Sequence, residues 1–378
     1  MTRPSLSLGQ PWGLALQNLL QDTLRLALSV IGVALAVMLI LFLLGLRAGI
    51  FRSAVIYLEH APGSVVVMPK GVSSTGAGSS QFLSPATAST VASTPGVARV
   101  TPIMLVLAIS ELHGKKEVIK LVGYDTASAG GPWDLARGGE PAADDEVVLD
   151  QTLASRHGFK VNDTFEVGGQ RLKVVGLSKQ TSSWTGSYVF ARKAFVESLV
   201  LTPGASSMIL VTPSPGTSAA DLAGNLRSLR DTNVLLKRQV MANDQQIIAG
   251  IADQIVILMI GVAFVVGALV VGMVIYTATA ERRGEYGIVK ALGAGNGVLY
   301  RVVAAQAVIA ASLGAALGVG FAYAMGWLVM TLKPQFLVTI QPSAILITIA
   351  AGFVMALLGA LFPARAIAGM APAEVFRR

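Results

Sequence analysis

The sequence has 378 residues and a formal net charge of +8, with 53% hydrophobic and only 13% charged residues, which is the composition of an integral membrane protein. The mean hydropathy of +0.65 agrees with this class. Because the chain contains no cysteine, disulfides, zinc–thiolate sites and cysteine nucleophiles are excluded.

The first 48 residues predict two helices. Residues 12–25 place apolar side chains on one helical face and polar ones on the other, which predicts an amphipathic helix on the membrane surface. A simple extension of the first span is the alternative. Leu26–Leu46 carries no charge and exceeds the roughly 20 residues that a transmembrane helix needs. A signal peptide is disfavoured because its apolar region is usually only about 7–15 residues long. We therefore predict a first transmembrane helix at residues 26–48.

Residues 49–249 change to the composition of a soluble α/β domain. Two β-rich runs, Val97–Leu112 and Glu117–Tyr124, flank His113–Gly114 and predict a hairpin. A second hairpin is predicted across Gly168–Gly169, because two glycines suit a tight two-residue turn.

The same domain contains sequence signals for the starts and ends of helices. Asp150 can cap a helix that ends at Gly158, and Ser84 followed by Pro85 predicts another helix start. Residues 240–254 look helical and run without a breaker into the second apolar run. A helix that passes from the domain into the membrane can carry displacement between them.

The last third predicts three further spans. The segments are a stalk and second transmembrane helix at 250–280, a polar loop at 281–301, a third span at 302–332, a fourth span at 335–364 and a tail at 365–378. Glycine and alanine recur at four-residue spacing in these helices, as in Ala263/Gly267, Ala268/Gly272, Gly314/Gly318 and Ala356/Ala360. Such faces let helices approach closely in lipid, and we expect most of them to pack within one chain.

Charge placement predicts the orientation in the membrane. Residues 51–253 are almost neutral, and nine of the eleven basic residues outside them fall on one side if four spans alternate. The positive-inside rule then puts both termini and the 281–301 loop in the cytoplasm. We therefore predict a multi-pass protein of the plasma (inner) membrane. We do not expect nucleic acid as a partner, because the excess positive charge lies beside the predicted spans and not in the soluble domain.

The residues that carry chemistry are sparse. The histidines His60, His113 and His157 show no metal-ligand spacing and are predicted to be isolated surface residues. The acidic cluster Asp144–Glu146 is interpreted as a solvated loop. The spans contain no ionisable side chain, which disfavours coupling to protons or sodium. We expect no catalytic residue, no metal site and no cofactor on this chain, so energy for any transport must come from a partner.

The polar loop has the pattern of a short helix. Glu281, Glu285, Ile288 and Leu292 share one helical face, and Gly293 can end the helix. Acidic residues near its start and a lysine near its end suit the helix dipole. This helix can dock into a groove on another protein, or it can rest on the membrane surface. The residues alone leave both readings open.

The loop sequence ERRGEYGIVKALGAGNGVL resembles the segment after the second span in permeases of the MacB/FtsX superfamily of ABC transporters. The closing FPARAIAGMAPAEVFRR and the domain segments TPGVARVTPI and HGFKVNDTFEVGGQRLKVVGL resemble the same family, with Asn162 where glycine is common. Asparagine also tolerates a left-handed turn. The resemblance covers essentially the whole chain and leans towards the DevC-like and heme-exporter-like branches.

This resemblance implies a fold of four transmembrane helices with a large extracytoplasmic α/β domain between the first and second. It implies a homodimer that works with two copies of a separate ATPase, which holds ATP and Mg, since this chain has no P-loop. A periplasmic adaptor or an extracellular protein is a further partner that the family allows. The family's coupling helix maps onto seven residues, namely Glu281, Arg282, Glu285, Ile288, Lys290, Leu292 and Gly293.

Two functions follow from the resemblance. The favoured one is export or extraction of a hydrophobic or amphiphilic substrate by ATP-driven mechanotransmission. The alternative is an FtsX-like signalling subunit that activates a partner such as a cell-wall hydrolase. Substrate identity is not predicted. Met38, Tyr57, His60 and Met68 lie near the outer end of the first span and could ligate heme, but ordinary packing is the favoured interpretation.

Overall fold

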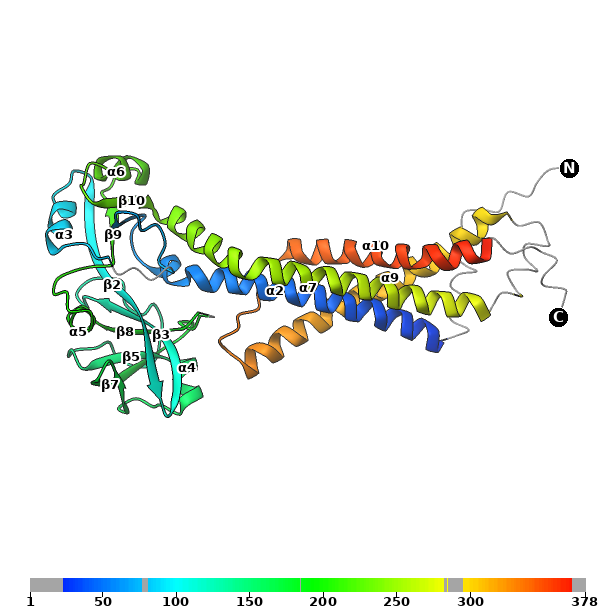
Figure 1. Cartoon of the computed structure of the whole chain (residues 1–378), viewed down its shortest axis with the longest axis horizontal. Helices are drawn as coiled ribbons and strands as arrows, with labels where there is room; N and C mark the ends of the chain where they lie inside the picture. Colours follow the sequence, from blue (N-terminus) through cyan, green and yellow to red (C-terminus); the bar gives the residue numbers. More distant parts are fainter. Residues whose placement is uncertain (1–22, 77–80, 184, 282–283, 285–294, 369–378) are drawn as a thin grey trace. The chain divides into compact units, whose positions relative to one another are not determined.

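The computed structural model describes residues 23–76, 81–183, 185–281, 284 and 295–368, so most of the predicted amphipathic helix at 12–25 lies outside the described residues. The chain folds into two compact units (Figure 1). We call them the helical unit, which runs up to Ala48, over Gln254–Val329 and from Val338 onward, and the sheet unit, which comprises Gly49–Asp253 and Met330–Leu337.

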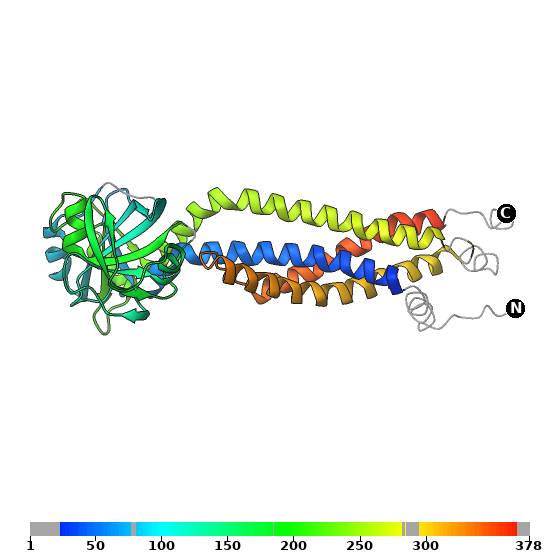
Figure 2. The same cartoon turned by 90° about the horizontal axis from the view of Figure 1, so that it is seen from below.

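The helical unit is built from four long helices that run side by side (Figure 2). They are α2 (Thr23–His60), α7 (Lys237–Glu281), α9 (Asn296–Leu332) and α10 (Pro342–Ala368). Within the described residues, each is long and apolar enough to cross a membrane. The predicted class, four membrane helices with a large α/β domain between the first two, is therefore confirmed. Helices α2 and α7 also continue beyond their spans into the sheet unit.

Small side chains hold the helical unit together. The backbones of Gly272 on α7 and Gly359 on α10 meet so closely that a Cβ on Gly359 would lie 2.8 Å from the Gly272 nitrogen. A Cβ on Gly267 would lie 2.6 Å from the Cβ of Ala36 on α2. A Cβ on Gly318 would lie equally close to the carbonyl oxygen of Ala34 on the same helix. The four-residue repeats of glycine and alanine therefore serve contacts between helices of the same chain.

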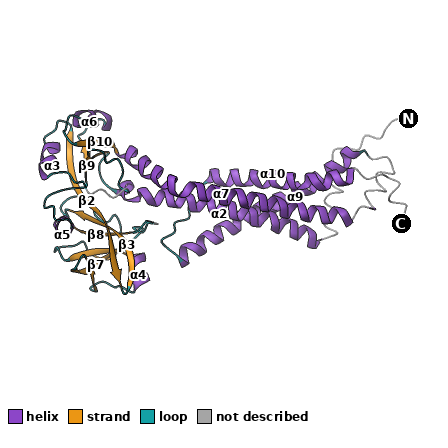
Figure 3. Ribbon diagram, viewed as in Figure 1, coloured by secondary structure: helices purple, strands orange, loops and turns teal. Residues whose placement is uncertain are grey.

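Within the described residues, the sheet unit contains ten strands and four short helices (Figure 3). The strands are β1 (Val65–Pro69), β2 (Val97–Leu112), β3 (Lys115–Tyr124), β4 (Leu135–Gly138), β5 (Glu146–Asp150), β6 (Thr164–Val167), β7 (Gln170–Ser178), β8 (Ser187–Arg192), β9 (Met208–Pro213) and β10 (Thr232–Leu236). The helices are α3 (Pro85–Ala92), α4 (Gln151–His157), α5 (Lys193–Leu199) and α6 (Ala219–Leu226). The strand order is β10-β1-β9-β2-β3-β8-β5-β7-β4, with β6 paired to β7.

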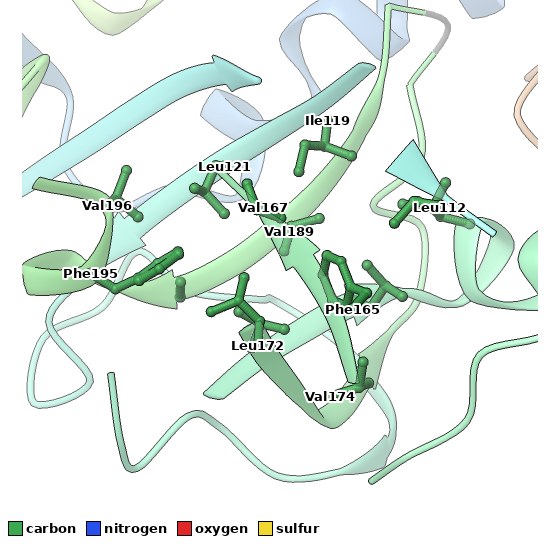
Figure 4. Close-up of a cluster of buried hydrophobic side chains, with 14 of the residues drawn as sticks. Leu112, Ile119, Leu121, Phe165, Val167, Leu172, Val174, Val189, Phe195 and Val196 are labelled. Carbon is green, nitrogen blue, oxygen red and sulfur yellow. The ribbon is translucent and has the colours of Figure 1, made fainter. Parts of the chain in front are cut away.

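Strand β2 joins two halves of this sheet. Its residues Val97–Ile103 pair with β9, and Met104–Leu112 pair with β3. One half buries a core between the sheet and helices α3 and α6, and the other half buries a core against α4 and α5 (Figure 4). The strands alternate buried side chains between the two faces, so one sheet supports cores on both sides.

Several local predictions are confirmed. The hairpin β2–β3 turns at His113 and Gly114, which both have positive φ, and β6–β7 turns at Gly168–Gly169 in the same left-handed region. The side chain of Asp150 accepts a hydrogen bond from the Leu153 amide at 2.9 Å and so caps α4, which ends at a left-handed Gly158.

The predicted start of α3 is confirmed, since Ser84 occupies its N-cap and Pro85 begins the helix, although the Ser84 hydroxyl pairs with that of Thr87 and not with a backbone amide. One local prediction needs correction. The three histidines are not all isolated surface residues. His157 is buried, its Nε2 lies 3.0 Å from Glu117 Oε1, and its carbonyl lies 2.6 Å from Nδ1 of His113. His157 thereby ties α4 to the β2–β3 hairpin.

The contact between Gly272 and Gly359 can be tested by substitution. We expect Gly272→Leu to lower the stability of the helical unit by about 1–3 kcal/mol, because overpacking forces two backbones apart. The measurement is SDS-induced unfolding of the purified chain. Gly261→Leu on the same helix is the matched control, since a Cβ there meets nothing within 4 Å. Equal stability of the two variants would show that the close contact is absent.

Candidate functional site

Of the seven predicted coupling residues, the structure describes Glu281, the last residue of α7. Helix α7 ends at Glu281, which is exposed, and α9 begins at Asn296. The other predicted coupling residues are outside the described residues; they are Arg282, Glu285, Ile288, Lys290, Leu292 and Gly293. Their assignment therefore stays a prediction from the sequence.

The four candidate substrate residues do not form one site. Met38 lies on α2 in the helical unit, whereas Tyr57, His60 and Met68 lie in the sheet unit. Tyr57 is buried, and its hydroxyl donates to the Gly130 carbonyl at 2.9 Å. The ring of His60 stacks on Trp133 with 4.5 Å between centroids.

Met68 is buried in the same core as Tyr57. Its neighbours there include side chains from strands β3, β8 and β9. Each of the three residues in the sheet unit thus has an ordinary packing role, and the heme interpretation gains no support from their placement.

The structure instead brings the ends of α2 and α7 into one core. Ile56, Tyr57 and Leu58 at the end of α2 pack in the same hydrophobic cluster as Val240 near the start of α7. Lys237 also joins the two helices directly, because its ammonium donates to the Ala61 carbonyl at 2.9 Å. Both helices that continue into the helical unit are therefore anchored in the same core of the sheet unit.

A buried carboxylate lies one turn after Val240. Asp244 is 2% exposed and accepts hydrogen bonds from the loop that follows β1. The donors are the Ser74 hydroxyl, the Thr75 amide at 2.8 Å, the Thr75 hydroxyl at 2.6 Å and the Gly76 amide at 3.2 Å. Hydrogen bonds to a charged group are the stronger ones in proteins. Asp244 therefore fixes residues 74–76 to helix α7, and we call this set of contacts the Asp244 latch.

Lys120 on β3 is a buried cation near this latch. It is 7% exposed, its Nζ lies 3.4 Å from the Ser183 hydroxyl, and it sits 5.1 Å from the ring centre of Tyr188. The salt bridges among the described residues do not include it. Burial lowers the pKa of Lys120 to about 8, although the negative charge of Asp244 opposes this shift.

The polar side chains described above serve as anchors. The described residues contain no group of three or more metal-ligating side chains. Burial raises the pKa of Tyr188, and the nearby Asp244 raises it further, so its phenol stays protonated. The polar groups of this region are used to fix helix ends and loops to the sheet.

Family comparisons agree with this organisation. The model of the MacB-like periplasmic core domain matches residues 26–229, and that of the FtsX-like permease C-terminal region matches residues 257–372. The chain belongs to the MacB/FtsX-type ABC transporter permeases. The first match covers more than half of the permease and includes the first span and most of the sheet unit. The second match covers most of the second span and all of the third and fourth.

Relatives match over nearly the whole length of the permease. An uncharacterized ABC transporter permease of Mycobacterium tuberculosis strain H37Rv is 25% identical over 364 residues, which cover 96% of this chain and 98% of the relative. An uncharacterized ABC transporter permease of Mycobacterium bovis is 24% identical over 354 residues, covering 93% and 95% of the two chains.

Solved structures with similarity include the periplasmic region of MacB from Actinobacillus actinomycetemcomitans, at 15% identity and a TM-score of 0.37, covering 48% of the permease and 92% of that chain. A second is the extracellular domain of the noncanonic ABC-type transporter YknZ from Gram-positive bacteria, at 14% identity and a TM-score of 0.35, covering 46% and 98%.

The Asp244 latch predicts a specific loss of stability. We expect Asp244→Ala to lower the free energy of unfolding of the sheet unit by about 2–3 kcal/mol, because two amides and two hydroxyls lose a charged acceptor. Urea unfolding followed by Trp133 fluorescence measures this. Asn243→Ala is the matched control, since it removes one bond to the Ser73 carbonyl and should cost less than about 1 kcal/mol. Similar losses in both variants would contradict the latch.

Lys120 predicts a pH dependence with a defined sign. Its folded-state pKa of about 8 lies below the unfolded value of 10.5, so the unfolded state binds more protons between these values and stability rises with pH there. The full difference corresponds to about 3 kcal/mol. We expect Lys120→Met to be more stable than the wild type at pH 7, with the gap closing towards pH 10. A gap that does not change with pH would contradict the burial of a charged lysine.

Proposed function

We propose that this permease exports or extracts a hydrophobic or amphiphilic substrate by mechanotransmission, driven by a separate ATPase. The observation that carries the proposal is the continuity of α7, one helix from Lys237 to Glu281. Its start is anchored in the sheet unit through Val240 and the Asp244 latch, and its end adjoins the predicted coupling loop. A helix anchored at one end can transmit a displacement that is applied at the other.

The composition of the helical unit favours a mechanical function rather than transport through a polar channel. Its main core consists of valine and alanine side chains with Ile275, and the sequence of residues 26–46, 255–280, 302–332 and 335–364 contains no Asp, Glu, Lys, Arg or His. A transporter that coupled to ions would be expected to place carboxylates or broken helices at mid-membrane. We infer that ATP hydrolysis on the partner supplies the energy, with Mg and ATP bound there and not on this chain.

The proposed assembly contains two copies of the permease and two of the ATPase in the plasma membrane. Both termini and residues 281–301 face the cytoplasm in this proposal, because nine of the eleven basic residues outside 51–253 then lie inside. The predicted face of Glu281, Glu285, Ile288 and Leu292 contacts the ATPase, with Arg282, Lys290 and Gly293 completing the coupling helix. A periplasmic adaptor or an extracellular protein remains a proposed further partner.

A charge reversal tests the coupling assignment. We expect Glu285→Lys to lower recovery of the ATPase with the tagged permease by about tenfold, because like charges at an interface strongly oppose binding. Transport should fall with it. Glu166→Lys, on an exposed position of β6, is the control and should leave recovery unchanged. Normal recovery and transport with Glu285→Lys would show that the coupling helix is wrongly assigned.

The signalling alternative is distinguished by substrate dependence. The assay measures ATP hydrolysis by the reconstituted complex in membranes, with and without hydrophobic candidates such as lipids, heme and antibiotics. Stimulation by a candidate supports transport. Hydrolysis that responds only to a cell-wall hydrolase bound to the sheet unit would support signalling in place of transport.

A further inference from the structure

A cavity of about 580 Å³ lies in the sheet unit beside the Asp244 latch. Its wall comes from β1, β2, the loop after β1 and the chain around residues 200–208, and its large side chains are Met68, Phe82, Leu105, Leu107 and Met208. The volume falls within the roughly 300–1,000 Å³ of small-molecule sites in proteins. The cavity is partly open to solvent, since Leu107 in its wall is 41% exposed, so a ligand can enter it.

The wall of the cavity is uncharged. None of the residues that line it is acidic, basic or a histidine. A charged ligand would therefore lose its hydration without gaining a counter-ion. The flexible thioethers of Met68 and Met208 can adapt to an apolar ligand of irregular shape.

Most hydroxyl groups in the wall already have partners. Ser74 and Thr75 donate to Asp244, while Ser207 donates to the Ile103 carbonyl at 3.1 Å and accepts from the Leu105 amide at 2.8 Å. Thr202 is the exception, because its buried hydroxyl has no hydrogen-bond partner among the described residues. The wall therefore suits a mainly apolar ligand and offers one free hydroxyl to a polar group on it.

Three side chains hold the loop that forms one wall. Asn233 on β10 donates to the Val72 carbonyl at 2.8 Å, Asn243 on α7 donates to the Ser73 carbonyl at 2.9 Å, and Asp244 holds the next three residues. A wall that is fixed before binding reduces the ordering cost of taking up a ligand. Two of the three holding residues belong to α7, so the wall and this helix are tied together.

We propose that this cavity binds one uncharged, mainly apolar small molecule, and that the Asp244 latch links its occupancy to helix α7. Binding is a property of the sheet unit alone. Only the role of that link in transport rests on the function proposed above. By thermodynamic linkage, a ligand that stabilises the wall also stabilises the arrangement of α7 to which the wall is fixed.

Photoaffinity labelling of the full chain in lipid nanodiscs tests the site. The probe is a neutral alkyl aryl-diazirine, and labelled peptides are located by mass spectrometry. We expect saturable labelling of the wall peptides around Met68, Leu105–Leu107 and Met208, which an excess of the same molecule without the diazirine abolishes. A carboxylate analogue should not label them. Labelling of the membrane spans reports partition into lipid and serves as an internal reference.

Two substitutions on β2 give a matched comparison. Leu107 lines the cavity and is 41% exposed, and Ile109 is 71% exposed on the same strand outside the lining. Neither position is part of the buried core, so both variants should fold. We expect Leu107→Asn to weaken saturable labelling about tenfold, the loss for removing one leucine's apolar contact, and Ile109→Asn to leave it unchanged. Labelling confined to the spans, or equal in both variants, would overturn the site.

Hydrogen exchange tests the link through Asp244. Adding the neutral molecule should increase protection of residues 72–76 and of the first turns of α7 in the wild type. In Asp244→Asn, the protection should stay on the cavity strands and disappear from α7. Protection of α7 that persists in this variant would overturn the link. Neither readout uses the ATPase or transport, so failure of this proposal is distinguishable from failure of the proposed function.

Discussion

The anchoring of α2 and α7 in one hydrophobic core is the constraint on which the rest of this permease depends. The two helices enter the same cluster through Tyr57 and Val240, and Lys237 bonds the end of one to the start of the other. Neither helix can shift far relative to the sheet unit without disturbing buried side chains. Close-packed cores have few intermediate arrangements, so the ends of α2 and α7 keep one arrangement within the sheet unit.

The helical unit complements this anchoring. Its helices meet at glycine and alanine, which permit contacts such as that between Gly272 and Gly359. The most exposed surfaces of α7 and α10 are apolar, as expected for helices that face lipid or another apolar helix. Such close contacts suit a unit that holds long helices in register.

The sequence predicted local structure well because the signals were local. The turns at His113–Gly114 and Gly168–Gly169 need left-handed residues, and the cap of α4 needs an acceptor three residues before its amide donor. The long apolar runs without charge predicted the spans for the same reason. In each case the deciding residues are neighbours in the chain.

Features that depend on distant residues escaped prediction. Asp244 accepts hydrogen bonds from residues about 170 positions earlier in the chain. Nothing in the neighbouring sequence distinguishes it from an ordinary polar residue of a helix. Lys120 and His157 are buried because β3 and α4 lie under other elements, although both residue types are usually found at the surface. The sharing of β2 between two half-sheets likewise depends on pairing with β9, a strand about 100 residues later.

Of the four residues that the sequence suggested for ligand binding, Met68 lines the cavity proposed above. Met38, Tyr57, His60 and Met68 drew attention because each can bind a metal or cofactor, yet side-chain chemistry alone does not make a site. The cavity is built from residues such as Leu107 and Ser207 that carry no distinctive chemistry. What distinguishes it is that most of its hydroxyl groups are paired, with Thr202 the exception, and that its wall is fixed to α7. Both properties arise only when the chain has folded.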